Sequence, residues 1–137
     1  MGGIQSIRRG EAHLAGIHLL NEKDGSYNQS FVNKYFPNGE AALIECVGRT
    51  QGIMVAKKNP KKITGISSLC DSDIQYINRQ KGSGTRILFD YLCKKERISS
   101  DSIHGYDHEE FTHNDVAKLI ANGEADAGMG VHAAAKL

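Results

Sequence analysis

Residues 79–86 form the segment of this sequence that is best suited to holding a ligand. They read Arg-Gln-Lys-Gly-Ser-Gly-Thr-Arg, between an apolar run that predicts a strand over residues 74–78 and a helix predicted over residues 86–95. A glycine loop that opens a helix presents backbone N–H groups at a point where the helix dipole favours an anion. Ser83 and Thr85 add hydroxyl donors, and Arg79 and Arg86 add positive charge. The segment therefore predicts an anion-binding site.

The same loop has a plainer interpretation as a helix cap. The hydroxyl of Ser83 or Thr85 can accept a hydrogen bond from an N–H group in the first turn of the helix. The glycines do not follow the G-x-x-x-x-G-K-[ST] spacing that cradles nucleotide phosphates, which disfavours an NTPase. The anion site and the helix cap both remain open from the sequence alone.

The histidines favour binding over catalysis. None of the six lies in a recognisable hydrolase motif such as G-x-S-x-G, and we expect neither catalytic residues nor a metal site. Glu109 and Glu110 beside His108 predict a solvated surface. His113 and His132 differ, because they stand at a predicted helix start and directly after a predicted strand. An open α/β sheet has its ligand crevice at such positions.

The composition limits the classes of protein that fit. The chain has 137 residues with 39% hydrophobic and 24% charged residues, enough for one core or for two small lobes. A formal charge of +1 lacks the basic excess of general nucleic-acid binding. The apolar runs fall short of the roughly 20 residues that cross a membrane. Cys46, Cys70 and Cys93 form no C-x-x-C pair, so we expect a cytoplasmic protein.

Strand-like and helix-like periods alternate along the chain, which is typical of α/β layers. Strands are predicted over residues 12–19, 41–57, 74–78 and 125–131, and helices over 27–35, 66–69, 86–95 and 114–121, with Ser26 and Thr112 as N-caps. Helical patterns also occupy the first residues and the last, 132–137. We therefore expect an α/β domain that is truncated at both ends.

Several blocks of sequence together resemble a known family. They read RGEAHLAGIHLL over residues 9–20, QGIMVA over 51–56, NP over 59–60, NRQKGSGTR over 78–86 and ADAGMG over 125–130. In this order they resemble the periplasmic-binding-protein-like domain that follows a helix-turn-helix in molybdate-type regulators, or the molybdopterin-biosynthesis domain in some bacterial and archaeal proteins. The resemblance covers nearly the whole chain, and NRQKGSGTR is its most specific part.

The resemblance implies a two-lobed, type II solute-binding fold with the ligand held between the lobes. Residues 1–45 would be part of the first lobe, and residues 46–137 would be the second lobe with the crossover strands. Matched position by position, the family's ligand contacts fall on Arg79, Gln80, Ser83, Gly84, Thr85 and Arg86 in the glycine loop, on Arg49 and Thr50 at the crossover, and on His113, Gly130 and His18 around the cleft.

The function predicted on this basis is a sensor or capture domain, not an enzyme. Its ligand would be a small oxyanion such as molybdate or tungstate, held between the lobes at the Gly-Ser-Gly-Thr helix start, with no other cofactor. We expect a homo-oligomer fused to a helix-turn-helix or molybdopterin-biosynthesis domain, in contact with neither nucleic acid nor membrane.

Two other functions stay open. One is a molybdopterin-related enzyme, or an accessory domain of a molybdopterin-biosynthesis protein that binds the cofactor or a nucleotide precursor, for which Tyr76, Tyr106 and Phe111 would offer aromatic surfaces. The other is a structural or dimerisation module whose cleft is vestigial.

Overall fold

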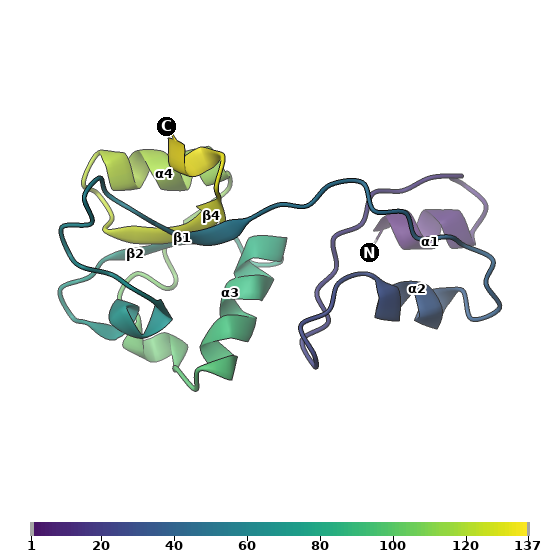
Figure 1. Ribbon diagram of the computed structural model, residues 1–137, viewed down its shortest axis with the longest axis horizontal. Coiled ribbons are helices and arrows are strands. Elements are labelled where there is room, and N and C mark those ends of the chain that lie inside the picture. The colour runs from purple at the N-terminus through teal and green to yellow at the C-terminus, as the bar shows by residue number, and fades with distance from the viewer. Residues whose placement is uncertain (1, 137) are drawn as a thin grey trace. The chain divides into compact units, whose positions relative to one another are not determined.

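The chain divides into two compact units, Met1–Gly48 and Arg49–Leu137. The computed structural model describes residues 2–136. Met1 and Leu137, which the sequence analysis assigned to the terminal helical patterns, lie outside the described residues. Unit 1 holds two helices and unit 2 holds the sheet with its covering helices, which Figure 1 draws in ribbon form.

Unit 1 is built around the helices α1 (Gly2–Arg8) and α2 (Gln29–Tyr35). Its buried apolar side chains are Ile4, Leu20 and Val32. The predicted strand over residues 12–19 is wrong, because those residues are irregular and the described part of unit 1 has one isolated bridge, Leu20 to Tyr27, in place of a sheet. An alternating pattern forms a strand only where a second strand is present to pair with it.

Asn28, and not the predicted Ser26, stands at the N-cap position of the second helix, and its side chain makes no capping hydrogen bond. Asn28 precedes Gln29 with φ of 63°, and its side-chain oxygen accepts a hydrogen bond from the N–H of Leu19 at 2.8 Å. Ser26 lies earlier, in a turn where its N–H donates to Asp24. Asparagine tolerates this left-handed conformation better than most residues, which explains why the helix starts later than predicted.

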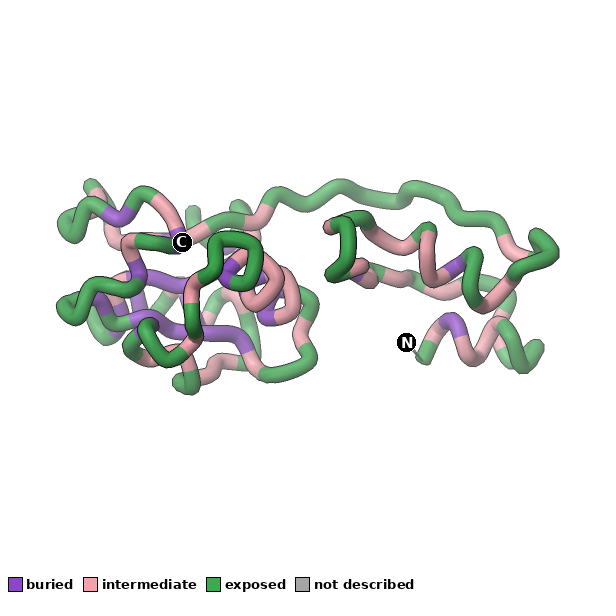
Figure 2. Tube along the Cα trace, turned by 90° about the horizontal axis from the view of Figure 1, so that it is seen from below, coloured by how far each residue is buried: buried purple, intermediate pink, exposed green. Residues whose placement is uncertain are grey.

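The long strand predicted over residues 41–57 is shorter than expected. Only β1 (Gln51–Val55) is a strand, and residues 42–50 are exposed throughout, as Figure 2 shows in green. The partner of β1 sets this limit, because β4 (Ala127–Val131) pairs with it from Gln51 opposite Val131 to Val55 opposite Ala127. The apolar residues before Gln51 have no strand beside them in the described chain.

Unit 2 contains a four-stranded mixed sheet in the order β1-β4-β2-β3. Strand β2 (Tyr76–Arg79) runs parallel to β4 and to β3 (Glu109–Glu110), and β1 runs antiparallel to β4. The helices α3 (Gly84–Lys95) and α4 (His113–Ala121) cover opposite faces of the sheet (Figure 1). The short helices η1 (Ile66–Cys70), η2 (Ser100–Ser102) and η3 (Ala134–Lys136) complete the unit. The predicted α/β fold class is confirmed.

Each face of the sheet has its own apolar core. Tyr76 of β2 lies in the core under α3, where its ring stacks on Phe89 at 4.6 Å between centroids. The next residue, Ile77, lies in the other core with Val116 and Ile120 of α4. Each such buried side chain contributes roughly 1.5–3 kcal/mol. The alternation along β2 therefore fixes which helix covers which face.

Helices α3 and α4 begin as their sequences predict. Ser83 caps α3 by accepting the N–H of Arg86 at 3.1 Å, and Thr112 caps α4 by accepting the N–H of Asp115 at 3.0 Å. The predicted short helix at residues 66–69 is found as η1. The predicted terminal pattern over 132–137 contains η3.

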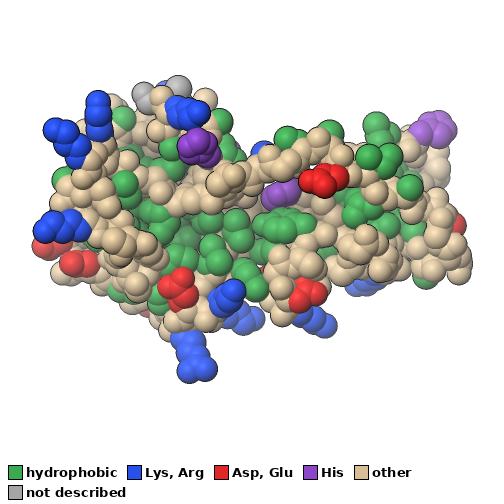
Figure 3. Space-filling model, in the orientation of Figure 1, with side chains coloured by type: hydrophobic (Ala, Val, Ile, Leu, Met, Phe, Trp, Pro, Cys, Tyr) green, Lys and Arg blue, Asp and Glu red, His purple; other side chains and the backbone are tan. Residues whose placement is uncertain are grey.

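Basic and acidic side chains are mixed on the surface, as the nearly equal numbers of the two kinds of residue lead one to expect. On the face drawn in Figure 3, lysine and arginine side chains stand among acidic and neutral ones. Between residues 2 and 136, no helix combines the length and the apolar character that crossing a bilayer requires.

Gly128 tests the close packing of α4 on β4. A Cβ atom at this position would lie 2.5 Å from Cγ1 of Val116 and 2.8 Å from the carbonyl oxygen of Ile77, so we expect Gly128→Ala to destabilise the protein by about 1–3 kcal/mol. Gly52→Ala on β1 is the control, because a Cβ atom there meets nothing within 4 Å. Urea unfolding measures both, and equal midpoints for the two variants would contradict this packing.

Candidate functional site

The carboxyl ends of the parallel strands define the candidate site. After β2 the chain enters α3 on one face of the sheet, and after β3 it enters α4 on the opposite face. Neighbouring strands that send the chain to opposite sides leave a crevice at their carboxyl ends, where open α/β sheets bind ligands. By this rule we expect a ligand crevice of unit 2 at the carboxyl ends of β2 and β3.

Two helix N-termini reach this edge. The caps accept hydrogen bonds from the N–H groups of Arg86 and Asp115. The N–H groups of Gly84 and Thr85 in α3 and of His113 in α4 also lie in the first turn, where no carbonyl of the same helix is in position to accept them. Both helix dipoles direct positive potential toward the same edge. The arrangement favours a negatively charged ligand.

Arg79 bridges the two strand ends at the crevice. Its Nη2 atom donates to the carbonyl oxygen of Phe111 at 2.7 Å, and its Nε atom donates to the carbonyl of Glu110 at 3.2 Å and to Oε1 of Gln80 at 3.1 Å. The residue is 8% exposed, and burial lowers its pKa from the usual arginine value. The guanidinium stays charged at neutral pH and adds fixed positive charge beside the crevice.

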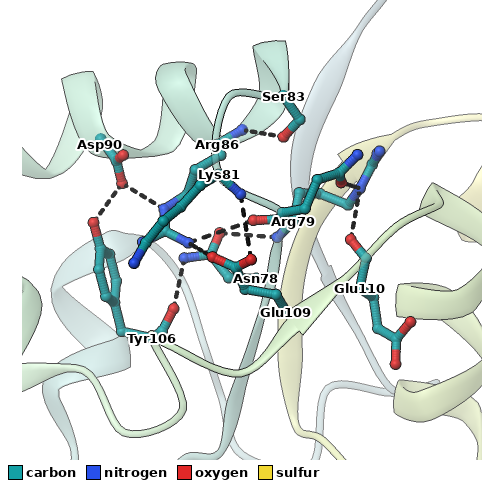
Figure 4. A network of polar contacts seen from close by, with 10 residues as sticks. Asn78, Arg79, Lys81, Ser83, Arg86, Asp90, Tyr106, Glu109 and Glu110 are labelled. Carbon is teal, nitrogen blue, oxygen red and sulfur yellow. Dashed lines mark hydrogen bonds and ion pairs between the residues drawn. The ribbon is translucent and has the colours of Figure 1, made fainter.

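Arg86 is held inside unit 2 by the network that Figure 4 shows. Its Nε atom donates to Asp90 at 3.1 Å, its Nη1 atom donates to Oε1 of Glu109 at 3.0 Å, and the guanidinium lies 4.1 Å from the centre of the Tyr106 ring. Burial alone would lower the pKa of Arg86, but the contacts with Tyr106 and Asp90 raise it above its ordinary value. Arg86 therefore anchors α3 to β3 rather than lining the crevice.

The loop between β2 and α3 is fixed by backbone hydrogen bonds. The N–H of Gln80 donates to the carbonyl of Glu110 at 3.1 Å, and the N–H of Ser83 donates to the carbonyl of Gln80 at 3.1 Å. The N–H of Lys81 reaches Oε2 of Glu109 at 3.4 Å. Gly82 has φ of 84°, a left-handed conformation that glycine adopts at no steric cost. Residues 80–83 thus form one defined turn, after which Gly84 begins α3.

Thr85 bonds within the protein as well. Its hydroxyl donates to Oε1 of Gln51 at 2.6 Å, and the residue is 6% exposed. Because this hydroxyl hydrogen points to Gln51, it is not offered to a ligand as the sequence suggested. Thr85 instead ties the start of α3 to the start of β1.

His113 occupies the first position of α4. Its Nδ1 atom is closed to solvent and has no hydrogen-bond partner among residues 2–136, and it lies 3.4 Å from where a Cβ atom of Gly130 would be. Burial lowers the pKa of His113, and the charges of Arg79 and Arg49 lower it further. The imidazole is therefore neutral at neutral pH and stands in a positive environment.

The structure gathers most of the predicted site residues at this edge of unit 2. Those that belong to the ends and starts of its strands and helices are Arg79, Gln80, Ser83, Gly84, Thr85, Arg86, His113, Gly130, Arg49 and Thr50. Thr50 takes part through its carbonyl, which accepts the N–H of His132 at 3.0 Å. His18 belongs to unit 1, where its ring lies 4.7 Å from that of Tyr27.

Sequence reasoning missed the partners of Arg86. Asp90 follows it by four residues, a helical spacing that could have identified the pair. Glu109 was assigned to a solvated surface, yet it forms an ion pair with an arginine whose side chain is 4% exposed. No local signal connects these two residues, because 23 positions separate them.

A shallow hollow elsewhere in unit 2 is lined by residues 100–108. These residues precede β3, and the carbonyl of His104 accepts the N–H of Tyr76 at the first position of β2. The hollow therefore lies at the amino ends of the strands, opposite the edge where sheets of this kind hold ligands.

Metal binding finds no support in the part of the chain that the structure describes. His104 and His108 have the H-x-x-x-H spacing, a pair that the sequence analysis overlooked, but they lie in the loop before β3 and not on one helix face. No group of three or more His, Cys, Asp or Glu side chains among residues 2–136 is arranged to hold a metal ion.

The mixed sheet with helices on both faces defines an α/β domain. The chain matches the family model of the periplasmic-binding-protein (PBP) superfamily domain over residues 1–137, and it belongs to this PBP-like family. It is 34% identical over 137 residues to the uncharacterized protein YvgK of Bacillus subtilis (strain 168). The match covers 100% of this chain and 44% of that protein, so the chain spans less than half of its relative. No solved structure matches the chain at comparable significance.

Arg86→Met tests the network at the start of α3. Removing one partner of a buried ion pair leaves the other charge unpaired, so we expect a loss of about 2–4 kcal/mol in the free energy of unfolding, reduced by the partial exposure of Asp90 and Glu109. Lys118→Met is the matched control, because its pair with Asp115 is exposed and its loss should not be measurable. Equal urea midpoints for the two variants would refute the anchoring role.

The lowered pKa of His113 predicts a pH dependence of stability. The pKa of His113 in the folded state lies below its value of about 6.5 in the unfolded state. Between these two pKa values the unfolded state therefore binds more protons than the folded state. The stabilisation is complete above about pH 6.5 and is lost as the pH falls toward the folded pKa. His113→Asn should flatten this part of the pH profile, measured by urea unfolding, and an unchanged profile would argue against a lowered pKa of the half-buried imidazole.

Proposed function

We propose that this domain binds a small oxyanion of the molybdate or tungstate type and acts as a sensor or capture module. The observation that carries the proposal is that two capped helices, α3 and α4, begin after the carboxyl ends of the neighbouring strands β2 and β3, where the guanidinium of Arg79 bonds to the carbonyl of Phe111. The family supports a ligand-binding role. The identity of the ligand is our inference from the donors at this edge.

The donors suit a tetrahedral dianion that carries no proton at neutral pH. Backbone N–H groups of Gly84 and Thr85 can contact its oxygens without a competing negative charge. Positive charge comes from Arg79 and Arg49, both of which lower the pKa of His113 at the same edge. Arg86, which the sequence analysis also assigned to the ligand, contributes by holding the loop in place.

Binding is favoured over catalysis because the edge lacks an activated nucleophile. The hydroxyl oxygen of Ser83 accepts a hydrogen bond from the N–H of Arg86, as a helix cap does. A nucleophilic serine needs a general base within hydrogen-bond reach of its hydroxyl, and no such contact links Ser83 to a histidine in the described chain.

One observation favours a larger ligand as the second candidate. Phe111, in the loop before α4, is 70% exposed and its carbonyl is held by Arg79. Of the three aromatic residues considered from the sequence, Tyr76 is fully buried and Tyr106 packs on Arg86, which leaves Phe111 to stack on a planar group. A molybdopterin precursor or a nucleotide would use that ring.

Gly84→Pro tests the oxyanion site. Proline at the first position of a helix keeps the helix but removes the N–H donor, and Ser83 with φ of −70° and ψ of 146° already has the conformation that a following proline requires. Losing a hydrogen bond to a charged ligand costs about 1.5–3 kcal/mol, so the affinity for tungstate should fall about tenfold to a hundredfold. Calorimetry measures the change.

Gly84→Ala is the matched control, because it keeps the N–H group and should bind normally. Equal affinity of the two variants would place the anion away from α3. Binding of a pterin or nucleotide in a thermal-shift screen, without binding of molybdate, tungstate, sulfate or phosphate, would favour the second candidate.

A further inference from the structure

The two edges of the sheet in unit 2 differ in how they are protected from pairing with another strand. Strand β3 forms one edge, and it consists of two charged residues, Glu109 and Glu110. Charge and short length are the usual means by which edge strands avoid pairing with another chain. Strand β1 forms the other edge with five residues, and it contains neither a charged residue nor a proline. The edge at β1 is therefore suited to pairing.

The backbone of β1 has hydrogen-bonding groups on its outer side. The carbonyl of Thr50 accepts the N–H of His132 at 3.0 Å, one position beyond the first pair of the ladder between β1 and β4. Bonded and non-bonded pairs alternate along antiparallel strands, so Gln51, Ile53 and Val55 direct their N–H and C=O groups away from β4. Outside the sheet, these three residues make no backbone hydrogen bond between residues 2 and 136. A further strand can bond to all three.

The residues on either side of Gln51 form a self-complementary pattern. Val47, in the segment before β1, is 71% exposed, and Val55 at the end of β1 packs against the core under α3. Glu45 and Lys57 are both exposed, and neither takes part in an ion pair among the described residues. The two valines lie at equal distances from Gln51 along the sequence, and so do the two charged residues. An antiparallel copy of this segment therefore matches valine with valine and acid with base.

We propose that two copies of this chain associate by antiparallel pairing of β1 with β1, about a two-fold axis at Gln51. Residues 47–55 of the two copies pair, so that Val47 lies opposite Val55 and Glu45 approaches Lys57 at both ends. A two-fold interface brings the same surface of each copy together, so that surface must be self-complementary. The two sheets become one continuous sheet, and the exposed Val47 is covered next to the core under α3.

The charges favour this register over its neighbours. Several centres along β1 would allow the outward-facing backbone groups of the two copies to meet. A centre at Ile53 would set Arg49 opposite Lys57, and like charges directly opposite each other destabilise a strand pair. A centre between Ile53 and Gln51 would set Lys57 opposite a valine. The centre at Gln51 sets Lys57 opposite Glu45, and the pair occurs twice because of the symmetry.

Sedimentation equilibrium of the full chain tests the association. One pair of short strands is a small interface, so we expect a monomer in dilute solution and a dimer as the concentration rises. Hydrogen exchange at a low and a high concentration then locates the interface. The amide hydrogens of Gln51, Ile53 and Val55 should exchange more slowly as the dimer forms. Those of Gly52 and Met54 should change less, because they already bond to β4.

Lys57→Glu should weaken the dimer, because it replaces an attraction by a repulsion at both ends of the interface. We expect the dissociation constant to rise about tenfold to a hundredfold. Adding Glu45→Lys to the same chain exchanges the two charges, so the double variant should recover the original dissociation constant to within about threefold. This recovery distinguishes a direct pair from a general effect of charge.

Lys58→Glu is the matched control. It makes the same change in net charge at a neighbouring exposed position, but in this register no charged residue of the second copy lies opposite it. Its dissociation constant should stay within about threefold of the original. All the substituted positions are exposed, so each variant should unfold at the same urea concentration as the original protein.

Four results would overturn the proposal. A chain that stays monomeric at millimolar concentration would reject the dimer. Equal weakening by Lys57→Glu and Lys58→Glu would place the interface elsewhere. Failure of the double variant to recover would reject the pairing of Glu45 with Lys57. Slow exchange at Ile53 and Val55 that is independent of concentration would show that this edge is already covered within one chain. Each of these results leaves the proposed function untouched, because none of them measures ligand binding.

Discussion

The buried guanidinium of Arg86 is the contact on which the geometry of the candidate site depends. It connects the first turn of α3 with Glu109 on β3 and with the ring of Tyr106, and its Nη1 atom also lies 3.4 Å from the carbonyl of Arg79 at the end of β2. Such buried pairs add little net stability, because desolvation of the charges offsets their attraction. Their effect here is to fix one arrangement of the glycine loop, so that α3 begins at the carboxyl end of β2.

Much of unit 2 could be predicted from the sequence because its signals are local. Thr112 caps α4 as the pattern indicated, and the apolar runs of β2 and β4 are buried strands. The predictions over residues 12–19 and 41–50 failed for a common reason. Alternating apolar residues specify a surface that can enter a sheet, but the presence of a neighbouring strand is a property of the whole fold.

The candidate site shows the same division between local and long-range information. Its anion loop could be found because glycines, hydroxyls and arginines occur within eight positions, and Ser83 indeed caps the helix that follows. The partner toward which each of these side chains points could not be predicted from the sequence. Thr85 reaches Gln51 across 34 positions and Arg86 reaches Glu109 across 23, and these pairings exist only once the sheet has formed. The capping role is therefore established, and anion binding remains a prediction.

The exposed segment over residues 42–50 has a practical consequence. Its backbone lies outside every helix and strand, so its amide hydrogens should exchange with solvent rapidly and its peptide bonds should be accessible to proteases. A cut between residues 42 and 48 would leave the sheet, both apolar cores and the candidate site residues of unit 2 on one fragment. Unit 2 is thus the natural piece of this protein to isolate for crystallisation and for spectroscopy of its histidines.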